Sequence, residues 1–264
     1  MSIISNHIIL FIIVVIAAIS GYKVRSLTLS GTFATIIVGL AILLAFGAKG
    51  LFLIGTFFVT SSFWSKYRAD KKKSMEDKIK KSGARDAVQV FANGGASALF
   101  SMLYLLFQEN FLLYMFITSL ATANSDTWAS EIGSISKRKP IHVLSLNRVD
   151  AGTSGAMSLL GTFSALCGAF LIGIISDYLW NEVTFQVGLA IGMVGFIGNL
   201  FDTILGATVQ VTYTCPNCGL ITEKTNHCGQ STIYKSGYRF LNNDTVNFLS
   251  IVLGSLLILL FSTI

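Results

Sequence analysis

Residues 184–209 read TFQVGLAIGMVGFIGNLFDTILGATV, and Asp202 is the only charged side chain among them. A helix needs about 20 apolar residues to cross the hydrocarbon core of a bilayer. Glycines recur along this stretch at three- or four-residue spacing, which puts small residues on one helix face and lets a neighbouring helix approach closely. The stretch therefore predicts a membrane-spanning helix with a glycine-lined face that leads to Asp202.

The rest of the chain has the same character. Of its 264 residues, 53% are hydrophobic and only 12% are charged, whereas a soluble domain has about 25% charged residues. Because backbone groups in lipid must be hydrogen-bonded internally, and the alternation of barrel strands is absent, the apolar runs predict helices. We expect an all-α fold, a polytopic membrane helix bundle of about seven or eight transmembrane helices, in one transmembrane domain over residues 1–264. The runs cover residues 3–19, 27–46, 50–64, 87–107, 111–128, 153–176, 184–209 and 245–262.

The distribution of basic residues predicts the orientation. Residues 50–64 are compatible with either a short span or a re-entrant hairpin. If they span, the loops 20–26, 65–86, 129–152 and 210–244 share one side and hold 18 of the 19 Lys and Arg residues. If they do not, the split becomes 17 to 2, and only the N-terminal helices invert. Either way the positive-inside rule places the long loops in the cytoplasm, so we expect a multi-pass cell-membrane protein with a cytoplasmic active face.

The formal net charge of +6 is explained by the same distribution. The basic cytoplasmic loop 65–86 is interpreted first as a topology determinant that rests on anionic headgroups, and alternatively as a collector of anionic substrate. The bilayer is therefore the expected partner of the positive charge, and no nucleic-acid partner is expected. The oligomeric state is not predicted.

Polar residues gather at the predicted cytoplasmic ends of the spans. Polar groups in a membrane are costly and are candidate functional residues by default. Carboxylate, amide and hydroxyl oxygens are the ligands that Mg²⁺ prefers, and carboxylate–metal sites are typical of phosphoryl transfer. The candidate residues are Asn93, Asn124, Asp126, Glu131, Thr153, Ser154, Asp202, Asn243 and Asp244.

Helix geometry limits how these residues can be combined. On a continuous helix Asp126 and Glu131 point about 140° apart, so either the helix breaks or the two acids make different contacts. Asp244 is interpreted either as a helix N-cap or as a site residue. Thr153 and Ser154 are expected to enter a span from the cytoplasm, where a helix N-terminus either binds phosphate or is simply capped.

The predicted cytoplasmic Cys/His insert, residues 210–244, contains a possible metal site. Cys215 and Cys218 form a Cys-x2-Cys knuckle, and His227 and Cys228 follow. Since disulfides are uncommon in the cytoplasm, a structural zinc ion is favoured over free thiols. Adjacent His227 and Cys228 are not expected to reach one ion together, so a fourth ligand is expected from elsewhere or is missing.

Five motifs follow one another along the chain. They are Asn124-Ser-Asp-Thr-Trp-Ala-Ser-Glu131, Gly152-Thr-Ser-Gly155, Asp202-Thr-x2-Gly206, the Cys-Pro-x-Cys loop and Leu241-Asn-Asn-Asp-x-Val-Asn247. Taken in order, these motifs resemble an integral-membrane family of largely unknown function, which includes transmembrane protein 19 and the chloroplast phytyl-phosphate kinase of tocopherol synthesis. The resemblance implies phosphorylation of a prenyl monophosphate to its diphosphate by a nucleoside triphosphate. Wider relatives, the phytol and dolichol kinases and CDP-diacylglycerol synthase, imply CTP and magnesium.

Three functions are therefore compared. In a membrane prenyl-phosphate kinase, Asp126, Glu131 and Asp202 would hold magnesium and the triphosphate, with Asp126 and Asp202 as the metal ligands. In this scheme Asn124, Asn93 and Asn243 orient phosphates, while Thr153 and Ser154 cradle the acceptor. The alternatives are a transporter or flippase for an anionic lipid or ion, which also uses Gly-rich helices and buried acids, and a scaffold that binds partners through its Cys loop.

Overall fold

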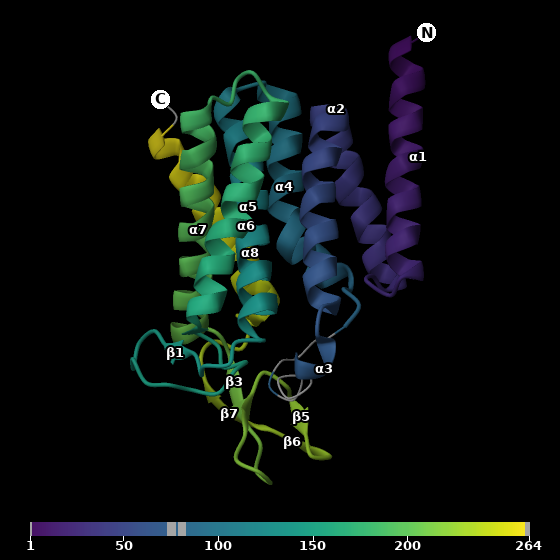
Figure 1. The fold of residues 1–264 in the computed structure, drawn as a ribbon. Coiled ribbons are helices and arrows are strands. Elements are labelled where there is room, and N and C mark those ends of the chain that lie inside the picture. Colours follow the sequence, from purple (N-terminus) through teal and green to yellow (C-terminus); the bar gives the residue numbers. More distant parts are fainter. Residues whose placement is uncertain (1, 73–77, 79–82, 262–264) are drawn as a thin grey trace.

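The computed structural model describes residues 2–72, 78 and 83–261, and it consists of a bundle of long helices with short strands at one end (Figure 1). Every predicted apolar run contains a helix, so the all-α membrane fold is confirmed. The helices are α1 (Ser2–Lys23), α2 (Leu29–Lys66), α3 (Ala69–Lys72), α4 (Ala87–Phe107), α5 (Asn110–Gly133), α6 (Leu159–Leu179), α7 (Phe185–Thr208), α8 (Asn243–Leu257) and the 3-10 helix η2 (Ile258–Phe261).

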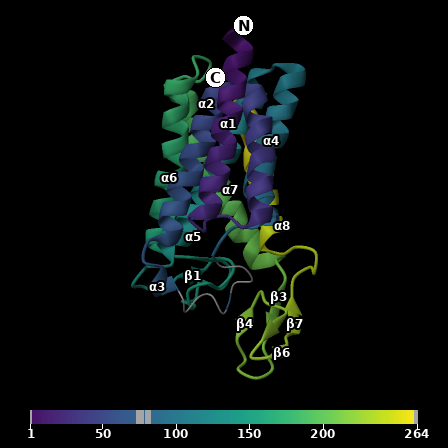
Figure 2. The ribbon, with the colours of Figure 1, turned by 90° about the vertical axis from the view of Figure 1, so that its right-hand side faces the viewer.

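The strands lie in the connections and form three small antiparallel sheets. One sheet pairs β1 with β2, the second has the order β4-β3-β7, and the third is the β5–β6 hairpin. Figure 2 shows the second and third sheets as a lobe beyond the end of the bundle. The strands are β1 (Ile141–His142), β2 (Ala156–Met157), β3 (Thr212–Thr214), β4 (Ile221–Thr222), β5 (Asn226–His227), β6 (Gln230–Ser231) and β7 (Ile233–Ser236).

Helix α2 is a hairpin of two helical arms that meet at Gly47, whose φ of 57° and ψ of −140° interrupt the helix. The first arm begins just after α1 ends. The second arm returns to the same end, since Lys66 Nζ donates a hydrogen bond to Val24 O over 2.6 Å. Residues 50–64 thus belong to one helical arm that traverses the bundle, and the re-entrant alternative is wrong.

With α2 folded back, successive segments alternate in direction, and both chain ends lie opposite the strands (Figure 1). Arg25, Arg85 and Arg239 lie at the strand-bearing end, where they line one cavity. Lys49 immediately follows the turn at Gly47 and lies at the opposite end. The structure therefore has the arrangement of the eight-span alternative. Lys73, Lys80 and Lys81 of the basic loop lie outside the described residues.

The outer surface of the bundle suits lipid. Among the described residues, α1, α2, α4, α6, α7 and α8 with η2 are long and apolar enough to cross a membrane. Large apolar side chains such as Phe33, Ile37 and Phe163 are exposed on their outer faces. Such a surface would be unusual in water but is ordinary for a helix bundle in a bilayer.

Helix α5 forms the centre of the bundle. It contacts α2, α4, α6, α7 and α8. Its residues are buried almost continuously from Leu112 to Ser125, hydroxyls and amides included. Because α5 is surrounded by protein rather than lipid, it can carry a polar sequence that the outer helices cannot.

The glycine-lined face of α7 packs on α5, as its spacing predicts. A Cβ atom at Gly195 would lie 2.7 Å from Ala121 Cβ, so only glycine permits this approach. Gly198 is in similar contact with Thr122. The two helices run in the same direction, and each continues about one turn past this contact to a carboxylate, Asp126 on α5 and Asp202 on α7.

The start of α6 differs from the prediction. The helix begins at Leu159, and Ser158 is its N-cap, with Oγ accepting a hydrogen bond from Gly161 N over 3.0 Å. Thr153 and Ser154 therefore lie in the connection before β2 and not at a helix N-terminus. The predicted phosphate cradle of helix dipole and free N–H groups is wrong, because a two-stranded sheet intervenes between these residues and the helix.

Candidate functional site

A polar cavity of about 600 Å³ lies between the helix bundle and the strand-bearing connections. Its walls come from the end of α2, the C-terminal ends of α5 and α7, the start of α8 and the loop before α6. The cavity contains most of the predicted site residues, drawn from distant parts of the chain. Those lining it are Asp126, Glu131, Thr153, Ser154, Asp202, Asn243 and Asp244.

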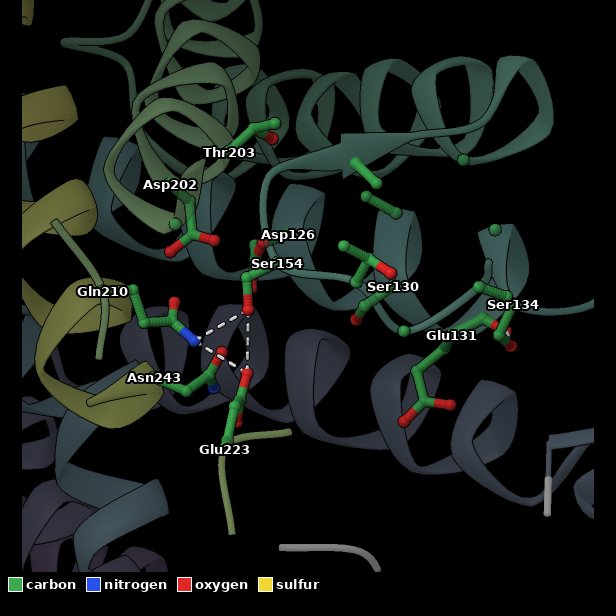
Figure 3. A pocket seen from close by; sticks show the side chains of 18 of the residues that line it. Asp126, Ser130, Glu131, Ser134, Ser154, Asp202, Thr203, Gln210, Glu223 and Asn243 are labelled. Carbon is green, nitrogen blue, oxygen red and sulfur yellow. Dashed lines mark hydrogen bonds between the residues drawn. The ribbon is translucent and has the colours of Figure 1, made fainter. Parts of the chain in front are cut away.

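Asp126 and Asp202 form the centre of this site. Their side chains come from neighbouring helices, line the same cavity and interact electrostatically (Figure 3). Asn199 Nδ2 donates a hydrogen bond to Asp126 Oδ1 over 3.0 Å. On the other side, Ser250 Oγ of α8 donates to Asp202 Oδ1 over 3.1 Å. When the side-chain amide of Asn247 is oriented so that its nitrogen faces hydrogen-bond acceptors, Nδ2 donates to the same Asp202 Oδ1 over 3.1 Å.

This carboxylate pair has the chemistry of a divalent-cation site. Within the described residues, no Lys, Arg or His side chain forms an ion pair with Asp126 or Asp202. The buried Oδ1 atom of Asn199 also has no hydrogen-bond partner there. Two close carboxylates repel each other unless a proton or a cation lies between them. Mg²⁺ is commonly held by one or two carboxylates and completed by water and substrate phosphates, which these residues fit.

Glu131 is separate from the pair. Helix α5 is continuous to Gly133, so Glu131 faces α2, where its Oε1 accepts a hydrogen bond from Ser65 Oγ over 2.6 Å. Of the two predicted alternatives, the structure shows the second: the helix is unbroken, and Asp126 and Glu131 make different contacts. Glu131 lines the same cavity but lies away from Asp126 and Asp202 in Figure 3.

Arg85 supplies positive charge next to Glu131. Its Nη1 donates a hydrogen bond to Ser62 Oγ over 3.3 Å, and its backbone pairs with Ser26 and Thr28. Burial lowers the pKa of the Arg85 guanidinium from its ordinary value, and the Glu131 carboxylate opposes that shift. An arginine stays protonated under such shifts, so this wall of the cavity is cationic. The other basic side chains that line the cavity are Arg25, Lys66 and Arg239.

Two predicted site residues lie outside the polar cavity. Asn124 is fully buried, where its Nδ2 donates to Gly168 O over 2.7 Å and its Oδ1 accepts from Thr60. It therefore joins helices α2, α5 and α6, and the structure does not bring it together with Asp126 and Asp202 in the polar cavity. Asn93 donates to Gln89 O within α4 and lines a second, apolar cavity.

A hydrogen-bonded triangle closes one side of the cavity (Figure 3). Gln210 Nε2 donates to Glu223 Oε1 over 2.7 Å and to Ser154 Oγ over 3.1 Å. Ser154 Oγ in turn donates to the same Glu223 oxygen over 3.1 Å. Thr153 is turned instead to its own loop, where its hydroxyl donates to Asp150 O over 2.8 Å. The loop 152–155 thus contributes through Ser154 and its backbone.

Glu223 is a site residue that sequence reasoning missed. It belongs to the Cys/His insert, directly after β4, and its charge acts on Asp202. No motif surrounds it, and the insert has no apolar pattern that would predict which of its side chains faces the bundle. Only its position between the Cys-x2-Cys knuckle and His227 could have drawn attention to it.

The start of α8 corrects the interpretation of Asp244. The N-cap is Asn242, whose Oδ1 accepts a hydrogen bond from Thr245 N over 3.1 Å, so the assignment of Asp244 as the cap is wrong. Asp244 lies in the first turn of α8 and lines the cavity together with Asn243. An acidic residue in the first turn also interacts favourably with the helix dipole.

The Cys/His insert brings all four of its predicted ligands together. One ligand atom from each of Cys215, Cys218, His227 and Cys228 lies within 4.8 Å of the others, and these residues are the only such group of three or more found in the described chain. The expectation that His227 and Cys228 would not reach one ion is wrong. Cys228 has φ of 52° and Gly229 has φ of 74°, and this tight turn brings Cys228 Sγ to 3.2 Å from His227 Nδ1.

The thiols of this group differ in acidity. A hydrogen bond from the backbone of Cys218 is the main cause that lowers the pKa of Cys215 to about 6, and His227 adds to it. Burial and the neighbouring sulfurs raise the pKa of Cys228 to about 11. Cys215 is therefore suited to be a thiolate ligand at neutral pH. Cys167 lies within α6, away from this group.

Fold and site together define a polytopic integral membrane protein with a polar, acid-containing pocket at one end of its helix bundle. The family model described as "Integral membrane protein DUF92" matches residues 12–255. The chain therefore belongs to this family of integral membrane proteins.

Relatives of the chain occur in archaea and plants. An uncharacterized membrane protein of Methanocaldococcus jannaschii is 30% identical over 96% of this chain and 93% of its own length. Protein PGR of Arabidopsis thaliana is 31% identical over 91% of this chain and 90% of its own. The chloroplastic protein VTE6 of the same plant is 27% identical over 98% of this chain and 71% of its own. No solved structure matches the chain significantly.

Proposed function

We propose that this protein is a magnesium-dependent membrane kinase that converts a prenyl monophosphate into the diphosphate, with a nucleoside triphosphate, CTP above all, as donor. The observation that carries the proposal is the pairing of Asp126 and Asp202 in a cavity that four basic side chains, Arg25, Lys66, Arg85 and Arg239, also line. A volume of about 600 Å³ is in the range of small-molecule sites and suits a nucleotide.

The reaction requires little covalent chemistry from the protein. An oxygen of the acceptor phosphate attacks the γ-phosphorus of the triphosphate, the bond from that phosphorus to the β-phosphate oxygen breaks, and a nucleoside diphosphate leaves. Because the acceptor phosphate is itself the nucleophile, no Ser, Cys or His nucleophile is needed. Bound magnesium would neutralise the triphosphate charge and hold its oxygens in line.

The residues of the chain would bind the metal, orient its ligands and contact the substrates. Asp126 and Asp202 would hold the metal, while Asn199 and Ser250 fix the orientation of those carboxylates through the hydrogen bonds described above. Ser154, Asn243 and Asp244 are placed on the cavity wall to contact phosphate, ribose or base. Glu131 would act through Arg85 by holding its charge in the wall.

A second cavity offers a place for the prenyl chain. It has a volume of about 140 Å³, is lined almost entirely by apolar side chains of α1, α2 and α4, and contains Gly39 and Gly55. Arg85 and Gln89 line both cavities, so they mark the boundary between them. We propose that the acceptor phosphate binds at Arg85 and that its chain lies along this groove toward the lipid. Asn93 would then contact the first part of the chain rather than a phosphate.

The family relationship supports this reading. The sequence motifs resemble those of a family that includes phytyl-phosphate kinase, and the relatives include a chloroplastic plant protein that the chain matches over 98% of its length. We place the cavity on the cytoplasmic side of the cell membrane, where nucleoside triphosphates are present and where the basic loops belong by the positive-inside rule.

The test is product formation by the purified protein in lipid nanodiscs. Phytyl, geranylgeranyl and farnesyl monophosphates would each be incubated with Mg²⁺ and with CTP, ATP, GTP or UTP, and the lipid products separated by chromatography. We expect a prenyl diphosphate with at least one pair and the largest yield with CTP. No diphosphate from any pair, in protein that is folded by thermal unfolding, would contradict the proposal.

The transporter and scaffold alternatives are less well supported. A transporter site needs access from both membrane faces, but the half of the bundle opposite the strands is filled by an aromatic cluster. Phe46 and Phe116 stack with ring centroids 4.4 Å apart, and Trp180 lies 6.0 Å from Phe46. Flux of prenyl phosphate across proteoliposomes without nucleotide would favour a flippase. A scaffold would tolerate neutral residues at Asp126 and Asp202.

A further inference from the structure

From its strands and the loops between them, the Cys/His insert contributes Tyr213, Glu223 and Thr225 to the lining of the candidate active site, and Glu223 is the carboxylate among them. Residues 215–218 and 227–228 carry the cluster, and the chain between them passes through β4 to Glu223 at the cavity. The backbone N of Glu223 also donates to Lys78 O over 2.8 Å, and Thr222 Oγ1 donates to the same oxygen over 2.9 Å. The four clustered residues therefore join the two ends of the loop that carries Glu223, a carboxylate of the cavity wall.

The insert lacks an apolar core of its own. Between residues 212 and 240, all of which the structure describes, only Cys215 and Thr222 are buried. Its strands are two to four residues long. Segments that bury so little apolar surface need a disulfide or a metal to hold one conformation.

A disulfide is not what holds it, because Cys218 Sγ and Cys228 Sγ are 3.9 Å apart and a bond requires about 2.05 Å. The spacing fits a metal instead. With bond lengths of about 2.3 Å to sulfur and 2.0–2.1 Å to nitrogen, tetrahedral zinc sets its ligand atoms about 3.5–3.8 Å apart. The separations are 3.9 Å between these sulfurs, 3.6 Å between Cys218 Sγ and His227 Nδ1, and 3.2 Å between Cys228 Sγ and His227 Nδ1. All four ligand atoms lie within 4.8 Å of one another, so the distances scatter around those of a tetrahedral site.

From this geometry we propose that Cys215, Cys218, Cys228 and His227 bind one structural zinc ion and that this ion holds Glu223 in the wall of the active-site cavity. The set fills all four tetrahedral positions, which is typical of structural rather than catalytic zinc. The binding energy of such an ion is folding energy for the segment that carries the ligands. Loss of zinc then releases Glu223 from Gln210 and Ser154 while the helix bundle stays folded. The role of Glu223 rests on the proposed function, whereas the zinc site does not.

The first measurement is the metal content of the full-length protein, purified in detergent without chelators, by mass spectrometry. We expect one zinc per chain, and loss of most of it in Cys218→Ser and in Cys228→Ser. Cys167→Ser is the matched control, because Cys167 lies in α6 outside the cluster, and it should keep its zinc. Absence of zinc from the wild-type protein together with no tetrahedral cobalt spectrum after Co²⁺ addition, or iron as the bound metal, would overturn the assignment.

The second measurement is amide hydrogen exchange in the insert. Removal of zinc by a chelator should speed exchange at least tenfold in peptides containing the Glu223 amide, and restoring zinc should reverse the change. Peptides from α7 should be unaffected. Unchanged exchange at Glu223 after verified zinc removal would overturn the positioning role. Neither readout requires kinase activity, so an inactive but zinc-loaded protein would contradict the proposed function alone. The variant Glu223→Gln should retain zinc, since its side chain is not a ligand.

Discussion

Asn199 of α7 donates a hydrogen bond from Nδ2 to Oδ1 of Asp126 on α5, over 3.0 Å, and Asp202 follows almost one turn later on the same helix. This bond ties the two helices together at the floor of the cavity. It depends on the close approach of α7 to α5 at Gly195 and Gly198. The packing of small residues in the bundle thus determines the spacing of the two carboxylates.

Gly195→Ala should destabilise the protein. Its Cβ would lie 2.7 Å from Ala121 Cβ, and overpacking a tight contact costs about 1–3 kcal/mol. Gly55→Ala is the matched control, because nothing lies within 4 Å of a Cβ there, and replacing a helical glycine by alanine gains up to about 1 kcal/mol. Unfolding midpoints in detergent should fall for the first and stay or rise for the second. Equal midpoints would contradict the packing described.

Asn124 and Asn199 should behave differently when each is replaced by alanine. Asn124→Ala removes a buried hydrogen bond to Gly168 O, which should cost about 1–3 kcal/mol of stability and leave kcat within about threefold at a permissive temperature. Asn199→Ala should mainly lower kcat, with little loss of folding stability, since it releases Asp126 from its hydrogen bond. Stability curves and steady-state kinetics on the pair decide this, and a catalytic loss in Asn124→Ala alone would reverse the assignment.

Arg85→Gln should weaken binding of the acceptor. A charge-assisted hydrogen bond contributes about 1.5–3 kcal/mol, so KM for the prenyl phosphate should rise roughly 10- to 100-fold with a smaller change in KM for the nucleotide. Arg138→Gln is the control, because Arg138 is exposed outside the cavity. If the KM for nucleotide rose instead, Arg85 would belong to the donor side.

The orientation can be tested with Lys49→Cys and Lys139→Cys, two exposed positions at opposite ends of the bundle. In right-side-out vesicles, a membrane-impermeant maleimide should label the first variant at once. The second should react only after permeabilisation. The reverse pattern would place the cavity on the outer side of the membrane.

The helices could be predicted from the sequence because their signal is local. Long apolar runs specify helices, and the spacing of glycines in α7 identified a packed face that ends at Asp202. The convergence of Asp126 and Asp202 was predicted from the clustering of polar residues at one set of helix ends, and the structure pairs them. Glu131 and Asn124 could not be assigned in this way, because the angle at which each side chain leaves α5 decides whether it meets α2, α6 or the cavity.

The connections were harder to predict than the helices. A run that includes Thr153 and Ser154 looks helical, but β2 and the Ser158 cap interrupt it. The role of Glu223 depends on tertiary contacts, and the His227–Cys228 turn depends on two successive left-handed residues, Cys228 and Gly229. Neither leaves a periodic pattern in the sequence.

The most direct test of the central claim measures transfer of the labelled γ-phosphate of CTP to geranylgeranyl monophosphate by Asp126→Asn, Asp202→Asn and Asp177→Asn in nanodiscs. Asp177 lies in the last turns of α6, at the opposite end of the bundle, and is the matched control. The rate should fall at least about 100-fold in the first two variants and stay near the wild-type rate in the third. Wild-type rates in all three, with Mg²⁺ present, would contradict the account.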